Sequence, residues 1–302
     1  MKPLTYTPYD GSQKPFTIGL MPLDMDRWIE TDADLDRYLD EKQLLANERR
    51  DEIFLAEENT EAAQQEVLDL LVGHLACRHS KTHRRDADVV SAGGHAVDLA
   101  DHLLPPLFKA GSLIADDLVI MRRKADGWHL VAGHVAFPSG WALQEKFGRP
   151  MHAIHGEVPG FGEGTRNATL INRIFDNLQV TQPVERFNWS VSAIGDLYKP
   201  LSQYRALRQS PVFTLDERFA RIERQTLRKL PETGDILFTI RIYIDPIAAI
   251  ARHPRASELA LNFAAQVEAL DEHQASYKGL REQRPELMRQ LRMLAETARS
   301  TR

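Results

Sequence analysis

The stretch from Ala115 to Phe137, ADDLVIMRRKADGWHLVAGHVAF, contains the clearest structural signal in the chain. Two largely apolar runs flank Ala125-Asp126-Gly127, and an Asp-Gly pair between such runs is typical of a tight β-turn. The stretch therefore predicts a β-hairpin whose second strand delivers the chain to Phe137.

A second hairpin is predicted further along the chain. Residues 236–244, ILFTIRIYI, are β-branched and aromatic, which favours a strand. They follow the turn-forming run PETGD at 231–235, so we expect the Arg-rich residues 218–229 to form the partner strand. Residues 184–194, VERFNWSVSAI, alternate in polarity and predict one more strand.

Helical spacing of apolar residues occurs on both sides of these strands. It predicts helices over 32–57, 60–78, 95–108, 165–178, 256–270 and 285–298. Residues 78–94 are polar and contain Gly93-Gly94, so a loop is expected there, and residues 1–31 are expected to form an arm that lays aromatic side chains onto the body. The order of elements predicts an α+β fold with an antiparallel sheet and no βαβ alternation.

The composition is that of an ordinary globular protein. The chain has 302 residues, a net charge of −5 and 43% hydrophobic residues, and its charges are interspersed, which argues against a nucleic-acid surface. Cys77 is the single cysteine, so a disulfide or a cysteine-ligated iron–sulfur cluster within the chain is excluded, and a small buried thiol is expected. There is no signal-peptide pattern and no membrane-length apolar run, so a cytoplasmic location is expected.

The segment that follows the first hairpin is dense in titratable groups. Phe137 to Phe161 reads FPSGWALQEKFGRPMHAIHGEVPGF, with His152 and His155 three residues apart. A single neutral imidazole can hold haem iron, whereas both histidines with Glu157 or Glu163 could form a non-haem iron site. Purely structural histidines are the third interpretation, and the residues alone leave all three open.

Several separated motifs in this region occur together. They are FPSGW, EKFG, MHAIHGEVPGF, RFNWS at 186–190 and ERQTLRKLPETGDILFTIRIY at 223–243. In this order they resemble the haem-dependent oxidative N-demethylase alpha-subunit family. The resemblance is strong over 115–245 and looser over the preceding helical region.

The resemblance implies a single haem-binding, PAS-like domain over 1–302, with helical N- and C-terminal extensions. Its parts would be a mostly helical flank at 1–110, a sheet core at 111–245 and C-terminal helices at 246–302. The family implies haem b, oxidation of a small secondary amine such as dimethylamine by O2, and electrons from a separate flavin and iron–sulfur reductase. The chain has neither a nucleotide fingerprint nor four cysteines, which agrees with an external electron source.

The resemblance also suggests an iron ligand. Ile154-His155 matches the family's Ile-His pair, so His155 is the expected proximal ligand, with His152 in reserve. Glu157 stands where the family more often has Pro, a local departure just after the expected ligand.

The rest of the expected site follows from what haem and an amine require. Propionates need cationic donors, and the candidates are Lys146, Arg186, Arg224, Arg228 and Arg241. Asn188 and Trp189 are expected either in the pocket wall or in a structural corner. The candidates for orienting substrate or moving protons are Tyr204, Glu223 and Gln225.

Two other functions remain open at this point. A PAS-like haem domain can act as a gas or redox sensor without turnover, although no output module is present in the sequence. A member of the family that has lost its cofactor would be a scaffold.

Overall fold

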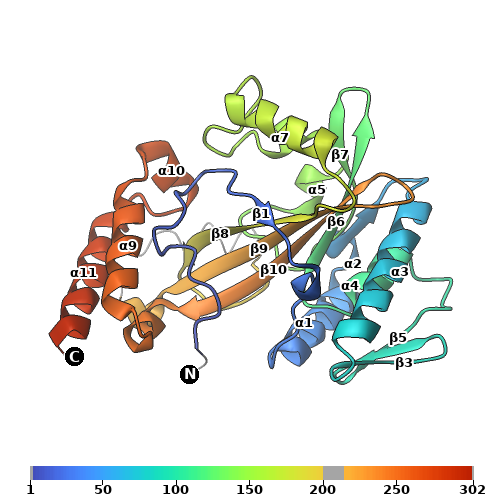
Figure 1. The fold of residues 1–302 in the computed structure, drawn as a ribbon, viewed down its shortest axis with the longest axis horizontal. Coiled ribbons are helices and arrows are strands. Elements are labelled where there is room, and N and C mark those ends of the chain that lie inside the picture. Colours follow the sequence, from blue (N-terminus) through green and yellow to red (C-terminus); the bar gives the residue numbers. More distant parts are fainter. Residues whose placement is uncertain (1–2, 200–213, 301–302) are drawn as a thin grey trace.

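The computed structural model describes residues 3–199 and 214–300. A seven-stranded sheet runs through the middle of the molecule, in the order β1-β8-β9-β10-β6-β7-β2 (Figure 1). Its strands are β1 (Met21–Pro22), β2 (Phe54–Ala56), β6 (Asp117–Lys124), β7 (Gly127–His134), β8 (Val184–Ser192), β9 (Phe219–Lys229) and β10 (Ile236–Pro246). Neighbouring strands of this sheet pair antiparallel throughout the described residues, so the predicted α+β class with an antiparallel sheet is confirmed.

Both predicted hairpins are present. β6 pairs with β7 around the Asp126-Gly127 turn, and Gly127 takes a φ of 143°, a conformation that side chains with a Cβ rarely adopt. β9 pairs with β10 over eleven positions, from Lys229 opposite Ile236 to Phe219 opposite Pro246. β10 then pairs with β6, which joins the two hairpins into one sheet.

Helices surround this sheet on several sides. The N-terminal set lies at one end of Figure 1 and consists of α1 (Leu35–Glu48), α2 (Arg50–Ile53), α3 (Glu61–Arg78) and α4 (Pro106–Gly111). The C-terminal set lies at the other end and consists of α9 (Ala256–Glu268), α10 (Glu272–Tyr277) and α11 (Arg284–Ser300). Between β7 and β8 the chain forms α5 (Leu143–Lys146), α6 (Met151–Ile154) and α7 (Arg166–Asn177). Short 3-10 turns lie at Met25–Arg27, Leu215–Glu217 and Ile247–Arg252.

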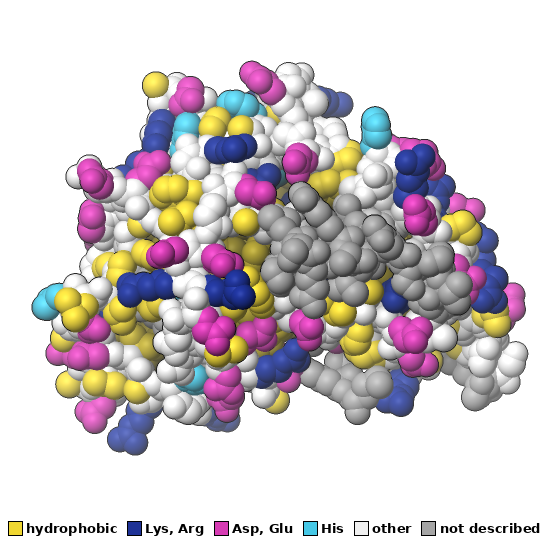
Figure 2. Space-filling view, turned by 180° about the vertical axis from the view of Figure 1, so that it is seen from behind, with side chains coloured by type: hydrophobic (Ala, Val, Ile, Leu, Met, Phe, Trp, Pro, Cys, Tyr) yellow, Lys and Arg dark blue, Asp and Glu magenta, His cyan; other side chains and the backbone are white. Residues whose placement is uncertain are grey.

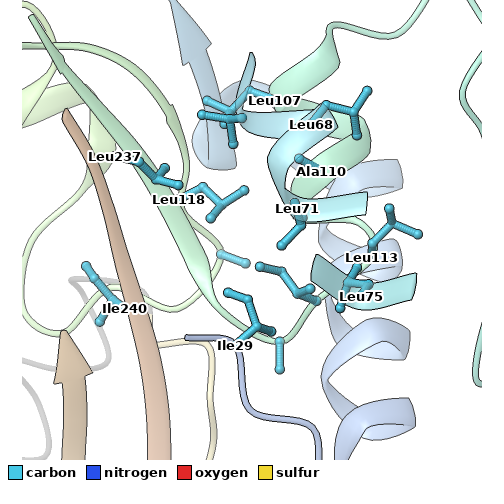
Figure 3. Close-up of a cluster of buried hydrophobic side chains, with 14 of the residues drawn as sticks. Ile29, Leu68, Leu71, Leu75, Leu107, Ala110, Leu113, Leu118, Leu237 and Ile240 are labelled. Atoms are coloured by element: carbon cyan, nitrogen blue, oxygen red, sulfur yellow. The ribbon is translucent and has the colours of Figure 1, made fainter. Parts of the chain in front are cut away.

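The two faces of the sheet have different partners. Side chains alternate along a strand, so Leu237 and Leu118 face one side while Phe238 and Val119 face the other. The Leu237 side packs against α3 and α4 in the largest buried cluster, which Figure 3 shows around Leu71. The Phe238 side faces the segment between β7 and β8 and is only partly filled by side chains.

Residues 78–108 differ from the prediction. The expected loop at 78–94 and helix at 95–108 instead form a small antiparallel sheet of β3 (His83–Asp86), β4 (Val89–Ala92) and β5 (His95–Asp98), followed by α4. Gly93-Gly94 is the two-residue turn of its second hairpin, and Gly93 has a φ of 56°. The last part of the helix expected over 32–57 is also wrong, because Phe54–Ala56 is the strand β2 paired with β7.

The surface bears out the interspersed charge pattern of the sequence. On the face shown in Figure 2, basic and acidic side chains are interspersed among the coloured residues. Cys77 is exposed, so the expectation of a buried thiol was wrong. Within the described ranges, no helix combines the length and the apolar character that a membrane crossing requires.

The helix-facing side of the sheet also buries charges. Arg241 is 1% exposed, donates to Asp32 at 3.2 Å and stacks over Tyr38, with its guanidinium carbon 3.9 Å from the ring centre. Asp116 is fully buried, and neither carboxylate oxygen has a hydrogen-bond partner among the described residues. Desolvation raises the pKa of Asp116 to about 6, although Arg241 nearby lowers it.

We predict that Asp116→Asn stabilises the protein increasingly as the pH rises. A folded-state pKa near 6, above the unfolded value near 3.8, means that the fold loses stability when it must ionise this carboxyl. The difference in unfolding free energy between variant and wild type should grow by about 2 kcal/mol between about pH 4.5 and about pH 7.5. Urea unfolding at the two pH values measures it, and a difference that is constant or shrinks would contradict the prediction.

Candidate functional site

The principal cavity lies on the Phe238 side of the sheet. It has a volume of about 820 Å³, within the range of about 300–1,000 Å³ typical of small-molecule and cofactor sites. Its floor is formed by β6, β8, β9 and β10, and its cover by the segment from Phe137 to Phe175 together with Phe16 of the N-terminal arm and residues of α10. Many of its lining side chains are apolar: Leu20, Val119, Met121, Leu130, Phe137, Ile171, Ile174, Phe175, Phe238 and Ile240.

Asp117 directs the chain into this cavity. It is 1% exposed at the start of β6, and its carboxylate accepts hydrogen bonds from the backbone N–H groups of Ala136 at 2.8 Å and Phe137 at 3.0 Å. These two N–H groups lie just past the end of β7, where the strand ladder no longer satisfies them. Asp117 therefore fixes the turn that carries Phe137 away from the sheet.

His155 lies at the end of the short helix α6 and lines the cavity. Its Nδ1 is 3.1 Å from the carbonyl oxygen of Met151, so the neutral ring carries its proton on Nδ1 and leaves a lone pair on Nε2. Desolvation lowers the pKa of His155 to about 4, and the positive charges of Arg186 and Lys146 lower it further. At neutral pH the ring is a neutral imidazole suited to bind a metal.

The other candidates for a two-histidine iron site do not converge with His155. His152 and Glu163 do not line the cavity, and Glu157 lines it but is exposed to solvent. Among the residues that the structure describes, no group of three or more His, Cys, Asp or Glu side chains is placed to hold a metal ion. The structure therefore favours a single histidine over a facial triad.

Four of the predicted site residues form one polar wall on β8 and β9. Arg186 is paired with Gln225 and Asn188 with Glu223 in the strand register, so all four point to the cavity side. Oε2 of Glu223 accepts from Gln225 Nε2 at 2.9 Å and from Asn188 Nδ2 at 3.3 Å, and Arg186 donates to Gln225 Oε1 at 3.3 Å. The two amides orient the carboxylate, and the cation lies beside them.

Lys146 is the fifth predicted residue that reaches the cavity. It belongs to α5, and its Nζ donates to the carbonyl oxygen of Ile154 at 2.8 Å, directly before His155 in the chain. Lys146 therefore links α5 to α6 and places a positive charge near the imidazole.

The remaining predicted arginines lie on the opposite face of the sheet. Arg224 donates to Glu185 at 2.8 Å and to the carbonyl oxygen of Trp28 at 3.1 Å, and Arg228 lies over the Trp28 ring at 4.3 Å. Arg241 is engaged with Asp32 and Tyr38, as described above. A one-residue offset along β9 or β10 moves a side chain to the other face, so these three do not line the cavity.

Two further candidates are not part of the described cavity. Trp189 is 4% exposed and donates from Nε1 to Gln266 Oε1 at 2.9 Å, which makes it a structural corner between β8 and α9. Tyr204 lies outside the described residues.

The structure adds Lys278, which no sequence pattern singled out. It follows α10, is 7% exposed, lines the cavity and donates to the carbonyl oxygen of Trp189 and to Asn188 Oδ1 at 3.4 Å. Desolvation lowers its pKa to about 8. Only the tertiary packing of the C-terminal helices brings it to β8, so no local signal could have revealed it.

One family model matches most of the chain. The family model described as haem-dependent oxidative N-demethylase, alpha subunit-like, matches residues 19–288. A search of the curated proteins finds no match to the chain. The matched range contains the whole sheet with all the cavity-lining side chains named above except Phe16.

We predict that Asp117→Ala destabilises the protein by about 2–4 kcal/mol, because two buried N–H groups lose the carboxylate that accepts their hydrogen bonds. Asp117→Asn keeps one carbonyl oxygen and should lose roughly half as much. Urea unfolding of the two variants and the wild type measures the series. Equal stability of Asp117→Ala and the wild type would show that the carboxylate does not hold this turn.

Proposed function

The chain belongs to the haem-dependent oxidative N-demethylase alpha subunit-like family, and on that premise we propose that its cavity binds haem b and supports N-demethylation of a small secondary amine. The observation that carries the proposal is His155: a half-buried, neutral imidazole that lines the cavity with its Nδ1 bound to a carbonyl oxygen. A metal-binding histidine commonly uses this arrangement, because the bond to Nδ1 orients the ring and leaves Nε2 for the metal.

The rest of the cavity fits the same cofactor. Haem needs an apolar slot for the macrocycle and cationic donors for its two propionates, and the lining supplies aliphatic and aromatic side chains together with Lys146 and Arg186. We propose that His155 would hold the haem iron and that Lys146 and Arg186 would pair with the propionates. When bound, haem supplies O2 activation at the iron and exchanges electrons with a separate reductase that carries flavin and an iron–sulfur cluster.

We also propose that the central five strands form a PAS-like sheet within a single domain. They comprise the hairpin β6-β7 and the three-stranded meander β8-β9-β10, whose last strand pairs with the first strand of the hairpin. The helical segment between β7 and β8 covers one face of that sheet and contains the proposed ligand. The N- and C-terminal helices are extensions of this core.

We propose Glu223 as the residue that binds the amine. A secondary amine is a cation at neutral pH, and a carboxylate held by two amides on the polar wall can bind its N–H groups. In this role Glu223 orients the substrate and accepts the proton that the amine must lose, while Asn188 and Gln225 keep the carboxylate in place. The apolar side chains around it accommodate the methyl groups and exclude water.

Haem uptake by histidine variants tests the ligand assignment. We expect His155→Ala to weaken the binding of haemin to the apo-protein by at least about 100-fold, because the cavity-lining imidazole beside Lys146 and Arg186 is lost. His152→Ala is the matched control, since it removes an imidazole three residues away that does not line the cavity. Titration followed by the Soret band gives both affinities. Unchanged affinity in His155→Ala, or a wild type that takes up no haemin, would overturn the proposal.

Replacing Glu223 tests the amine-binding role. Glu223→Gln is expected to retain haemin affinity while lowering amine-dependent formaldehyde release by about 100-fold, since the isosteric amide cannot pair with an ammonium or take its proton. The assay uses dimethylamine, O2 and a surrogate reductant. If wild-type protein binds haemin but releases no formaldehyde from any small N-methylamine, the sensor function is favoured. Equal release by variant and wild type would remove Glu223 from the mechanism.

A further inference from the structure

The polar wall of the cavity contains more positive than negative charge. It consists of Arg186, Asn188, Glu223 and Gln225, completed by Lys278 where α10 meets β8. Glu223 is its one acidic member, and the described residues show no ion pair, within 4.0 Å, from any carboxylate to Arg186 or Lys278. Two cations therefore share one carboxylate whose Oε2 already accepts two amide hydrogen bonds.

Lys278 has fewer backbone acceptors than two other buried lysines, Lys42 and Lys109. Lys42 donates to three backbone carbonyl oxygens at 2.5–3.0 Å, and Lys109 donates to two at 2.7 and 3.0 Å. Lys278 has one backbone carbonyl, that of Trp189, and a long contact of 3.4 Å to the Asn188 amide oxygen. Of these three lysines, only Lys278 lines the cavity.

The remaining surroundings of Lys278 are aromatic. Its Nζ lies 4.5 Å from the centre of the Trp189 ring and 5.1 Å from that of Phe16. Aromatic faces attract an ammonium group, but they do not neutralise its charge. A buried ammonium group without a paired carboxylate is costly, and an anion entering from the cavity would remove that cost.

Arg186 is similarly placed beside it. Its two terminal nitrogens donate to neutral acceptors, Gln225 Oε1 at 3.3 Å and the carbonyl oxygen of Thr17 at 3.1 Å. Its Nε is buried and has no hydrogen-bond partner among the described residues. A guanidinium with an unused donor on a cavity wall suits a carboxylate, which can accept more than one of its N–H groups.

We propose that Lys278, together with Arg186, forms a carboxylate-binding site at this end of the cavity, with Lys278 as a ligand-binding residue supplied by the C-terminal helices. The proposal rests on the function proposed above, and the same chemistry has two sources. One is a haem propionate. The other is the carboxylate of an N-methylated amino acid, whose ammonium group would pair with Glu223 while its carboxylate pairs with Lys278.

Three variants separate a ligand-binding role from a structural tie between α10 and β8. Lys278→Met removes the charge at similar volume, and Lys278→Arg retains it. Lys109→Met is the matched control, because Lys109 is 4% exposed and donates to backbone carbonyls outside the cavity. Far-UV circular dichroism and urea unfolding establish that each variant folds.

Binding to the apo-protein is then measured with four probes: haemin, haemin dimethyl ester, N-methylglycine and dimethylamine. If a propionate is the ligand, Lys278→Met weakens haemin binding about 10- to 100-fold and leaves the binding of haemin dimethyl ester unchanged. Lys278→Arg then restores most of the affinity for haemin. If the substrate carboxylate is the ligand, haemin binding is unchanged, and N-methylglycine loses a similar factor while dimethylamine does not. Lys109→Met shows neither change.

If the Lys278→Met variant binds all four probes with wild-type affinity, the proposed carboxylate site is overturned and the haem proposal stays intact. Wild-type protein that takes up no haemin would overturn the proposed function instead. The site is then judged by the thermal stabilisation that N-methylglycine gives the apo-protein. Stabilisation that disappears in Lys278→Met supports the site, and no stabilisation of the wild type overturns it.

Discussion

The pairing of β10 with β9 on one side and β6 on the other is the constraint on which the rest of the structure depends. Eleven paired positions with β9 and five with β6 fix the register of the central strand, and the register fixes which side chains face which way. The side chains of Leu237, Thr239 and Arg241 point to the helix side, whereas those of Phe238, Ile240 and Ile242 line the cavity. One register therefore decides both where the core forms and where a cavity can exist.

Several buried cations on the two faces of the sheet have different hydrogen-bond partners. On the helix side, Arg224 is satisfied by Glu185 and by two carbonyl oxygens of the N-terminal arm, and Lys42 by three carbonyl oxygens. These bonds attach separate chain segments to the sheet. On the cavity side, Arg186 and Lys278 have neutral partners and spare donors. A carboxylate entering the cavity would compensate these two cations, which is the physical basis of the proposed carboxylate site.

The sequence predicted the sheet better than the site. Both long hairpins have strong β-branched runs around Asp-Gly or Pro-Gly turns, so local signals and tertiary structure agree. Residues 83–98 were mispredicted because their strands are only four residues long and β3 is rich in charge, although Gly93-Gly94 is itself a hairpin turn signal. The arginines of β9 and β10 could not be sorted by composition, since the face of each depends on the register. Lys278 depends on the packing of α10 against β8, which no local pattern reports.

The same positive charges contribute twice to the chemistry of the cavity. Burial is the largest cause of the low pKa of His155, and Lys146 and Arg186 add to it because a second positive charge nearby is unfavourable. A histidine kept neutral in this way retains the lone pair that a metal needs. Lys146 and Arg186 donate hydrogen bonds to a carbonyl oxygen and an amide oxygen, which are weaker acceptors than a carboxylate. The two cations therefore favour an anionic ligand beside the imidazole. A group that combines a Lewis-acidic metal with carboxylates satisfies both requirements at once.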